Sequence, residues 1–126
     1  MTLENYNIVE LTEVLYNALE GISENIFLYQ RPKVHDKMKD FIVVDFPNRV
    51  YNNLGNGRTN CVIELYVRDK ASGPNAARLS YLQEKINERL PITDDKCNIY
   101  HPVYHNMGPD NLGFHCIMIY CKVLIK

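Results

Sequence analysis

The sequence predicts an α+β domain in which two helices pack on one face of an antiparallel sheet of about four to five strands. Two observations carry this prediction. Apolar residues recur with helical spacing in two separate segments, near the N-terminus and in the middle of the chain. Segments of β-branched or alternating apolar residues lie between these helices and again after the second one. The predicted order is therefore helix, strands, helix and hairpin, in one domain that spans residues 1–126.

The first predicted helix runs from Glu4 to about Glu24. Its apolar residues follow the i, i+3, i+4, i+7 rule of an amphipathic helix: Ile8, Leu11, Leu15, Ala18, Leu19 and Ile22. Gly21 weakens the last turn. The short apolar run from Ile26 to Gln30 then predicts a strand, which ends before Pro32 because proline has no N–H to donate to a sheet.

The middle of the chain contains the clearest buried strand. Phe41 to Phe46 is continuously apolar except for one aspartate and is rich in β-branched residues, as in strands that are covered on both faces. After Pro47, Arg49 to Tyr51 resumes the strand pattern. Asn52 to Arg58 contains two glycines and three asparagines, residues that tolerate positive φ angles, and we expect a mobile loop there.

A strand followed by a helix is predicted from Thr59 to about Leu90. Residues alternate from Thr59 to Arg68, with one fully apolar side and one mixed side, which is typical of a sheet with one buried face. The helix begins at Pro74, with Ser72 or Gly73 as its cap, and Pro91 ends it. Its inner face carries Ala76, Leu79, Leu82, Ile86 and Leu90.

Two strands follow at the C-terminus, Asn98 to Met107 and Phe114 to Lys126, joined by a turn that contains Gly108, Pro109 and Gly113. The last strand alternates strictly at first, yet both of its faces are apolar. A strand of this kind lies inside a sheet or is covered by a partner.

Composition excludes several classes of protein. The chain has 126 residues, 46% hydrophobic and 23% charged, with a net charge of −1, so no global charge favours nucleic acid or an anionic membrane. No segment reaches the length of about 20 apolar residues that a membrane span needs, and the N-terminus shows no signal-peptide pattern. The four cysteines form no C-x-x-C pair, and we expect buried free thiols in a reducing compartment.

The best candidate metal ligands are histidines of the C-terminal hairpin. His101 and His105 are about 13 Å apart along one strand and cannot share an ion. If the hairpin is centred on Asp110, however, His105 and His115 are directly opposite, with Cβ atoms about 5 Å apart. Two imidazoles at that distance suit zinc if a third ligand joins them, but the sequence offers none. Ordinary cross-strand histidines are the competing interpretation.

No other segment predicts catalysis. The sequence has no G-x-S-x-G motif, and its cysteines do not lie at helix starts, where a thiolate is favoured. Asp94 and Asp95 are adjacent in a loop after the helix and point apart. A basic run that includes Arg31, Lys33 and Lys37 is interrupted by aspartates and lacks an aromatic platform for nucleic acid. We interpret it as a solvated loop, with contact to a protein partner or DNA as the alternatives.

Several segments together resemble the small tail-terminator, or tail-completion, proteins of long-tailed bacteriophages. The segments are the helix ending in Leu15–Gly21, the strand Phe41–Phe46, the strand ending in Leu65-Tyr66-Val67-Arg68-Asp69, the helix with Ala76-Ala77-Arg78-Leu79 that ends at Leu90-Pro91, and the C-terminal strand pair. The order of elements matches over nearly the whole chain, and the residues match best from Thr59 to Leu90. The long C-terminal strands and their histidines depart from the family pattern.

The resemblance implies a structural protein of the virion neck and tail that assembles in the bacterial host cytoplasm. Such proteins form a ring, typically six-fold, that caps the tail tube and joins it to the head connector. It implies no enzymatic activity, no cofactor and no metal, and as partners other copies of the chain, the tail-tube protein and connector or neck proteins. We expect partner contacts from Phe114–Ile125 and from the Asn48–Arg58 loop, with these residues foremost: Arg49, Arg58, Phe114, Met118 and Tyr120.

Two other functions stay open on the sequence. One is a small α+β binding or interaction module that dimerises through its sheet. The other is a small metal-dependent enzyme that uses the His105–His115 hairpin. A closed ring would support the tail-terminator hypothesis, and stoichiometric zinc would support the enzyme.

Overall fold

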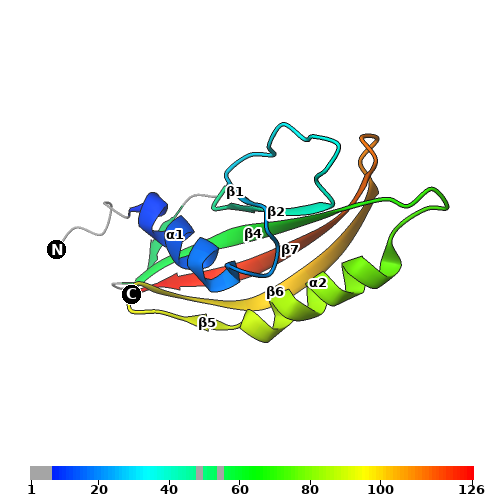
Figure 1. Cartoon of the computed structure of the whole chain (residues 1–126). Coiled ribbons are helices and arrows are strands. Elements are labelled where there is room, and N and C mark those ends of the chain that lie inside the picture. Colours follow the sequence, from blue (N-terminus) through cyan, green and yellow to red (C-terminus); the bar gives the residue numbers. More distant parts are fainter. Residues whose placement is uncertain (1–6, 48–49, 54–55) are drawn as a thin grey trace.

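The computed structural model describes residues 7–47, 50–53 and 56–126. It shows an α+β fold in which two helices pack against a strongly curled sheet (Figure 1). The elements along the chain are α1 (Ile8–Leu19), β1 (Ile26–Leu28), β2 (Asp40–Asp45), β3 (Tyr51–Asn53), β4 (Asn56–Arg68), α2 (Ala76–Arg89), β5 (Ile92–Thr93), β6 (Cys97–Pro109) and β7 (Phe114–Ile125).

Both helices begin at an asparagine cap. The side-chain oxygen of Asn7 accepts a hydrogen bond from the N–H of Glu10 (3.1 Å), and that of Asn75 accepts one from the N–H of Arg78 (3.2 Å). The cap of α2 is therefore Asn75, rather than the predicted Ser72 or Gly73. Helix α1 ends at Leu19, earlier than predicted, because the chain turns through Gly21 with a φ of +89°.

The sheet has seven strands in the order β1-β2-β4-β7-β6-β5, with β3 also pairing with β4. The predicted antiparallel sheet of four to five strands is wrong in two respects. Strands β1 and β2 are parallel, so the sheet is mixed. Strands β3 and β5 have three and two residues, too few to give a periodic signal in the sequence. The interior position predicted for the last strand is confirmed, because β7 lies between β4 and β6.

The glycine- and asparagine-rich segment predicted as a mobile loop is instead mostly strand. Tyr51 pairs with Arg58, Asn52 with Gly57 and Asn53 with Asn56, which makes β3 and β4 a tight hairpin. Residues 54 and 55 at its tip lie outside the described residues. The number of turn-forming residues therefore overstated the length of the loop, because several of them lie in paired strands.

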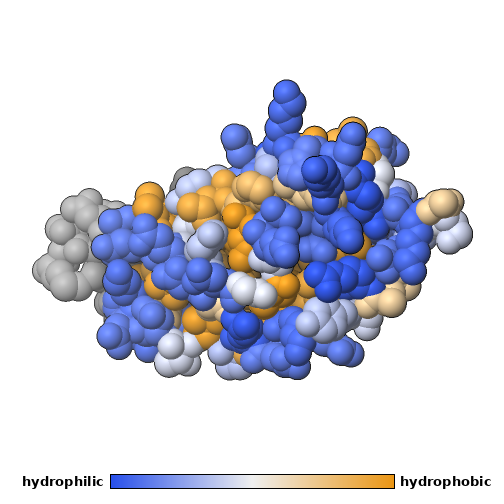
Figure 2. Space-filling view, viewed as in Figure 1, coloured by the Kyte–Doolittle hydropathy of each residue, from blue (hydrophilic) through white to orange (hydrophobic). Residues whose placement is uncertain are grey.

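The main core lies between the helices and one face of the sheet. It contains apolar residues of α1, α2, β2 and the three long strands β4, β6 and β7: Leu11, Leu15, Leu19, Ile42, Val44, Cys61, Ile63, Leu65, Leu79, Leu82, Ile86, Ile99, Ile119, Cys121, Val123 and Ile125. The predicted packing of both helices on one face is thus observed. Figure 2 shows the outer surface of this side as largely hydrophilic, with apolar patches between the polar side chains. No helix among the described residues is long and apolar enough to cross a membrane.

Candidate functional site: the open face of the sheet

The face of the sheet opposite the helices is covered at one end only. Residues 29–39 connect β1 to β2 and fold over that end, where they help to bury a second apolar cluster. The cluster contains Met38, Phe41, Val43, Tyr66, Phe114 and Cys116. Side chains of one strand point alternately to its two faces, so the cluster takes its residues from the face of β2, β4 and β7 that points away from the main core.

Arg31 fastens this loop to the sheet. Its guanidinium lies over three rings, 4.8 Å from the centroid of Tyr66, 5.4 Å from Phe41 and 5.6 Å from Phe114. Its Nη1 atom lies 2.5 Å from the Oδ2 atom of Asp110 in the β6–β7 turn. Cation–π contact and the ion pair together compensate for the partial burial of this charge.

Asp110 also orders the turn in which it lies. Its Oδ1 atom accepts hydrogen bonds from the N–H groups of Leu112 (2.8 Å) and Phe114 (3.0 Å). Burial by itself raises the pKa of the Asp110 carboxyl, but these backbone donors and the Arg31 guanidinium outweigh it and lower the pKa overall. The carboxylate therefore holds a loop and a hairpin tip together.

Arg68 is the second anchor of the same loop. It donates hydrogen bonds to the carbonyl oxygens of Met38 and His35, both at 2.9 Å, and its guanidinium lies 4.6 Å from the Phe114 ring centroid. Both arginines thus contact the ring of Phe114. The loop is consequently packed on the sheet through Arg31 and the buried Met38. The other basic residues of the run are exposed, as the solvated-loop interpretation predicted: Lys33, His35, Lys37 and Lys39.

Beyond the loop, the same face of the sheet is open. Val103 of β6 is 43% exposed and Tyr120 of β7 is 38% exposed, and the two are paired across the strands. His105 packs edge-on against Tyr120 with centroids 5.1 Å apart, and the Tyr120 hydroxyl donates to the sulfur of Met118 (3.3 Å). We define the open face as Val103, His105, Met118 and Tyr120.

A polar region borders the open face at the far end of the strands. Arg58 of β4 donates a hydrogen bond from Nη1 to the Tyr100 hydroxyl of β6 (3.1 Å), and this contact spans the intervening β7. Lys122 lies between them on β7, in a shallow depression that these three side chains help to line. The exposed apolar residues thus have a basic and hydroxyl-bearing border, which is a common composition for the rim of a protein contact.

The edge of β6 is a less suitable contact than its face. Strand β5 pairs only with Asn98 and Ile99, so among the described strands none pairs with the outer edge from Tyr100 onward. Pro102 and two irregularities in the register interrupt this edge, and such features discourage the addition of another strand. We therefore place the candidate site on the open face.

Only some of the predicted contact residues lie where a partner could reach them. Arg58, Met118 and Tyr120 fall on one face of the sheet, and Met118 and Tyr120 belong to the open face. Phe114 is fully buried beneath the two arginines, so its side chain is not available to a partner in this conformation. Arg49 lies outside the described residues, as do Asn48, Leu54 and Gly55 of the predicted contact loop.

The predicted pairing of two histidines is wrong. His105 is opposite Met118, and His115 is opposite Pro109, because the turn is centred beyond Asp110. His115 instead contacts the side-chain oxygen of Asn106 (3.0 Å). No group of three or more possible metal ligands occurs among the residues that the structure describes.

The cysteines are buried and free, as predicted. Burial raises the pKa of the Cys97 and Cys116 thiols to about 11. Both therefore remain protonated thiols at neutral pH, and a thiol is a weaker nucleophile than a thiolate.

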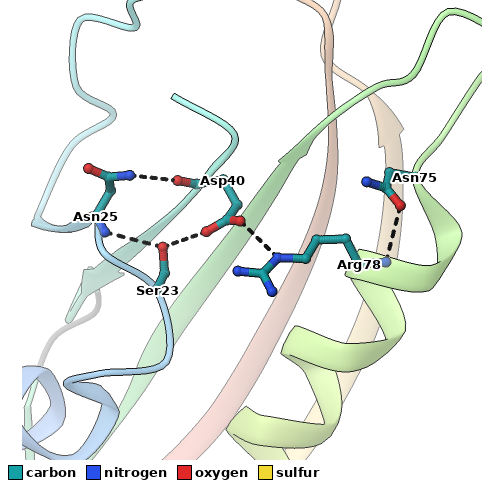
Figure 3. A network of polar contacts seen from close by, with 5 residues as sticks. All are labelled: Ser23, Asn25, Asp40, Asn75 and Arg78. Atoms are coloured by element: carbon teal, nitrogen blue, oxygen red, sulfur yellow. Dashed lines mark hydrogen bonds and ion pairs between the residues drawn. The ribbon is translucent and has the colours of Figure 1, made fainter. Parts of the chain in front are cut away.

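A polar network lies on the other face of the sheet, beside the helices (Figure 3). The buried carboxylate of Asp40 at the start of β2 accepts hydrogen bonds from the hydroxyl of Ser23 (2.6 Å) and from the Nε of Arg78 in α2 (3.0 Å). The side chain of Asn25 donates to the Asp40 carbonyl (3.1 Å). This network joins the segment after α1, strand β2 and the first turn of α2, so we interpret it as structural.

Sequence reasoning missed the two residues that organise the site. It placed Arg31 in a solvated loop and Asp110 at a hairpin tip without a partner. A signal existed for Asp110, because the side-chain carboxylate of an aspartate in a turn often accepts a hydrogen bond from the backbone N–H two residues later. For Arg31 the sequence contained no comparable local signal, since its three aromatic contacts come from three different strands.

Comparison with known proteins supports the fold. No family model matches the chain, and no curated protein matches its sequence. Twenty-four chains of solved structures match its fold. One of them, a protein whose name states no function, is similar with a TM-score of 0.57 at 5% sequence identity, over 94% of this chain and 91% of the other. At that identity, the likeness shows a shared α+β fold over nearly the full length of both chains.

Proposed function

We propose that this protein is a structural virion protein of the tail-terminator type, which forms a ring on the end of a phage tail tube and joins it to the head connector. The open face carries the proposal, because exposed apolar side chains grouped on one surface mark sites of protein contact. Val103 and Tyr120 are exposed there beside the half-buried Met118. In this proposal the open face contacts the tube or the connector, and the basic residues at its border contact carboxylates of that partner.

The order of the elements is consistent with the proposal. A helix, a strand, a Pro-containing loop, the strand β2, the strand β4, the helix α2 and a long strand pair follow one another as the resemblance implies, except that the short strand β3 pairs with β4 where a loop was expected. A ring that only caps a tube needs rigid surfaces and no covalent chemistry. The anchored loop of residues 29–39 and the tied hairpin tip supply that rigidity.

Native mass across a concentration range, with electron microscopy of the largest species, tests the proposal. We expect a closed ring with an open lumen, either alone or after addition of tail tubes from the phage that encodes the chain. A dimer whose mass does not change with concentration and that does not bind the tubes would contradict the proposal and favour an interaction module. Arg58→Glu is expected to weaken tube capping, and a variant that caps normally removes Arg58 from the contact.

A further inference from the structure

The β6–β7 hairpin tip presents an exposed apolar side chain near two lysines, with Asp36 and Asp69 also close by. Leu112 is 65% exposed, the largest exposure among the large apolar residues described. It borders a depression with Lys33 and Arg68, and Lys70 lies nearby because the N–H of Asp69 donates to the Gly113 carbonyl (2.8 Å). Neither lysine forms an ion pair among the described residues.

The hairpin tip is held in a fixed shape. Asp110 accepts two backbone hydrogen bonds within the turn and pairs with Arg31, as described above. An exposed side chain on a preorganised turn loses little conformational entropy when it binds. Leu112 is therefore suited to insertion into an apolar groove.

A groove of complementary character lies at the other end of the molecule. It runs between α1 and β5, has a volume of about 520 Å³, and is lined on its apolar side by Val14, Ala18 and Ile92. In Figure 1, α1 and β5, which line this groove, lie at the opposite end of the long strands from the β6–β7 turn. Strand β4 has 13 residues, which separates the two ends by about 40 Å.

The rim of this groove is acidic. Glu10, Glu13, Asp94 and Asp95 line it, and the one basic residue among its lining residues, Lys96, is paired with Glu10 at 3.8 Å. Glu13 and Asp95 are exposed and have no ion pair among the described residues. One molecule thus offers an exposed apolar residue beside two lysines without ion pairs at one end, and an apolar groove beside two carboxylates without ion pairs at the other.

We propose that the groove binds the β6–β7 tip of a second copy of this chain, with Leu112 in contact with Val14, Ala18 and Ile92. Lys33 and Lys70 then face Glu13 and Asp95 of the neighbour. Because the two surfaces differ, this contact is head-to-tail, and head-to-tail contacts close into rings when the rotation between copies permits. The inference rests on the proposed function for its ring, and it leaves the open face free for the tube.

Charge exchange between the two ends tests this contact on the full chain. The variants are Lys33→Glu with Lys70→Glu, and Glu13→Lys with Asp95→Lys. Each alone is expected to raise the concentration needed for assembly by about ten-fold or more at low salt, because each brings like charges together. An equimolar mixture is expected to restore assembly to within about three-fold of wild type, with the two variants alternating.

Two further variants separate charge from contact. Lys85→Glu on α2 moves the net charge in the same direction at a site away from both ends and from the open face, and is expected to assemble as wild type does. Leu112→Asp is expected to prevent assembly, whereas Leu112→Met retains it. Circular dichroism and thermal unfolding of every variant establish that each is folded.

The outcomes distinguish this contact from the proposed function. If wild type forms a ring and both charge-reversed variants form the same ring, the contact is wrong and the ring function stands. Wild type could instead form linear assemblies that never close into a ring. If, in addition, each charge-reversed variant fails to assemble alone and an equimolar mixture of the two assembles, the contact stands and the ring function is wrong. A wild-type chain that stays monomeric at low salt, with and without tubes, contradicts both.

Discussion

The guanidinium of Arg31 lies 2.5 Å from the carboxylate of Asp110 and joins the β1–β2 loop to the tip of the β6–β7 hairpin. This pair, the aromatic cluster beneath it and the hydrogen bonds from Arg68 to the loop carbonyls hold the loop in place. The same pair orders the hairpin tip on which Leu112 is presented.

Replacement of Asp110 measures the strength of this connection. Asp110→Ala is expected to lower the free energy of unfolding by about 2–3 kcal/mol, because it leaves Arg31 without its carboxylate and two backbone N–H groups without acceptors. Asp110→Asn keeps an acceptor and is expected to cost about 1 kcal/mol. Urea unfolding measures both. Equal loss in the two variants would show that the ion pair, and not the backbone bonds, dominates.

The ion pair also predicts a dependence of stability on pH. The folded-state pKa of Asp110 lies below its ordinary value of 3.8. A carboxyl of this kind contributes stability above its unfolded-state pKa and loses it as pH falls through the folded-state pKa. The stability difference between wild type and Asp110→Asn is therefore expected to be constant between about pH 5 and 7 and to shrink below about pH 4. A difference that grows on acidification would contradict the assignment.

Much of the fold could be predicted from local patterns. The strand Thr59–Arg68, helix α2 and the two C-terminal strands alternate or repeat strongly enough for the sequence to place them within a few residues. Strand β1 was also found, but its parallel pairing with β2 was not, because a strand's direction depends on where the following loop returns. The two shortest strands, β3 and β5, are defined by their pairing with β4 and β6 and are too short to give a local pattern in the sequence.

The site was predicted only in part, for a similar reason. Alternation placed Met118 and Tyr120 on one face of β7, and that face is open. The alternation also grouped Phe114 with them, and no local rule reveals that a distant loop covers one end of the same face. The His105–His115 hypothesis failed because the centre of a hairpin cannot be fixed from the sequence when its turn contains several glycine, proline and asparagine residues.

The Asp40 network offers a second test of stability. Asp40→Asn retains an oxygen for the Ser23 hydroxyl but loses the ion pair with Arg78, which is expected to cost about 1 kcal/mol. Asp40→Ala removes the acceptor of both the Ser23 hydroxyl and the Arg78 guanidinium and is expected to cost about 2–3 kcal/mol. A double-mutant cycle with Arg78→Ala isolates the pair. A coupling near zero would mean that Arg78, which is partly exposed, is satisfied by water instead.

The buried thiols predict slow chemical modification. All four cysteines are buried, and the raised pKa values of Cys97 and Cys116 keep both thiols protonated at neutral pH. Reaction of the native protein with an aromatic disulfide reagent is expected to be about 100-fold slower than reaction in denaturant, since it requires opening of the core. Four thiols should react after unfolding. Rapid native reaction at any one position would show that its strand opens locally.

The open face gives the prediction that bears most directly on function. Val103→Thr with Tyr120→Thr replaces exposed apolar side chains by a polar residue that is well suited to strands, and is expected to change the free energy of unfolding by less than about 1 kcal/mol. It is nevertheless expected to abolish capping of tail tubes while leaving ring assembly intact, because the two contacts use different surfaces. The matched control is Tyr81→Gln on α2, which removes a tyrosine of similar exposure (48%) from the helical side. Sedimentation of rings with tubes measures capping, and native mass measures assembly. If the control loses capping and the open-face variant keeps it, the partner contacts the helices, and the sheet face is not the binding surface.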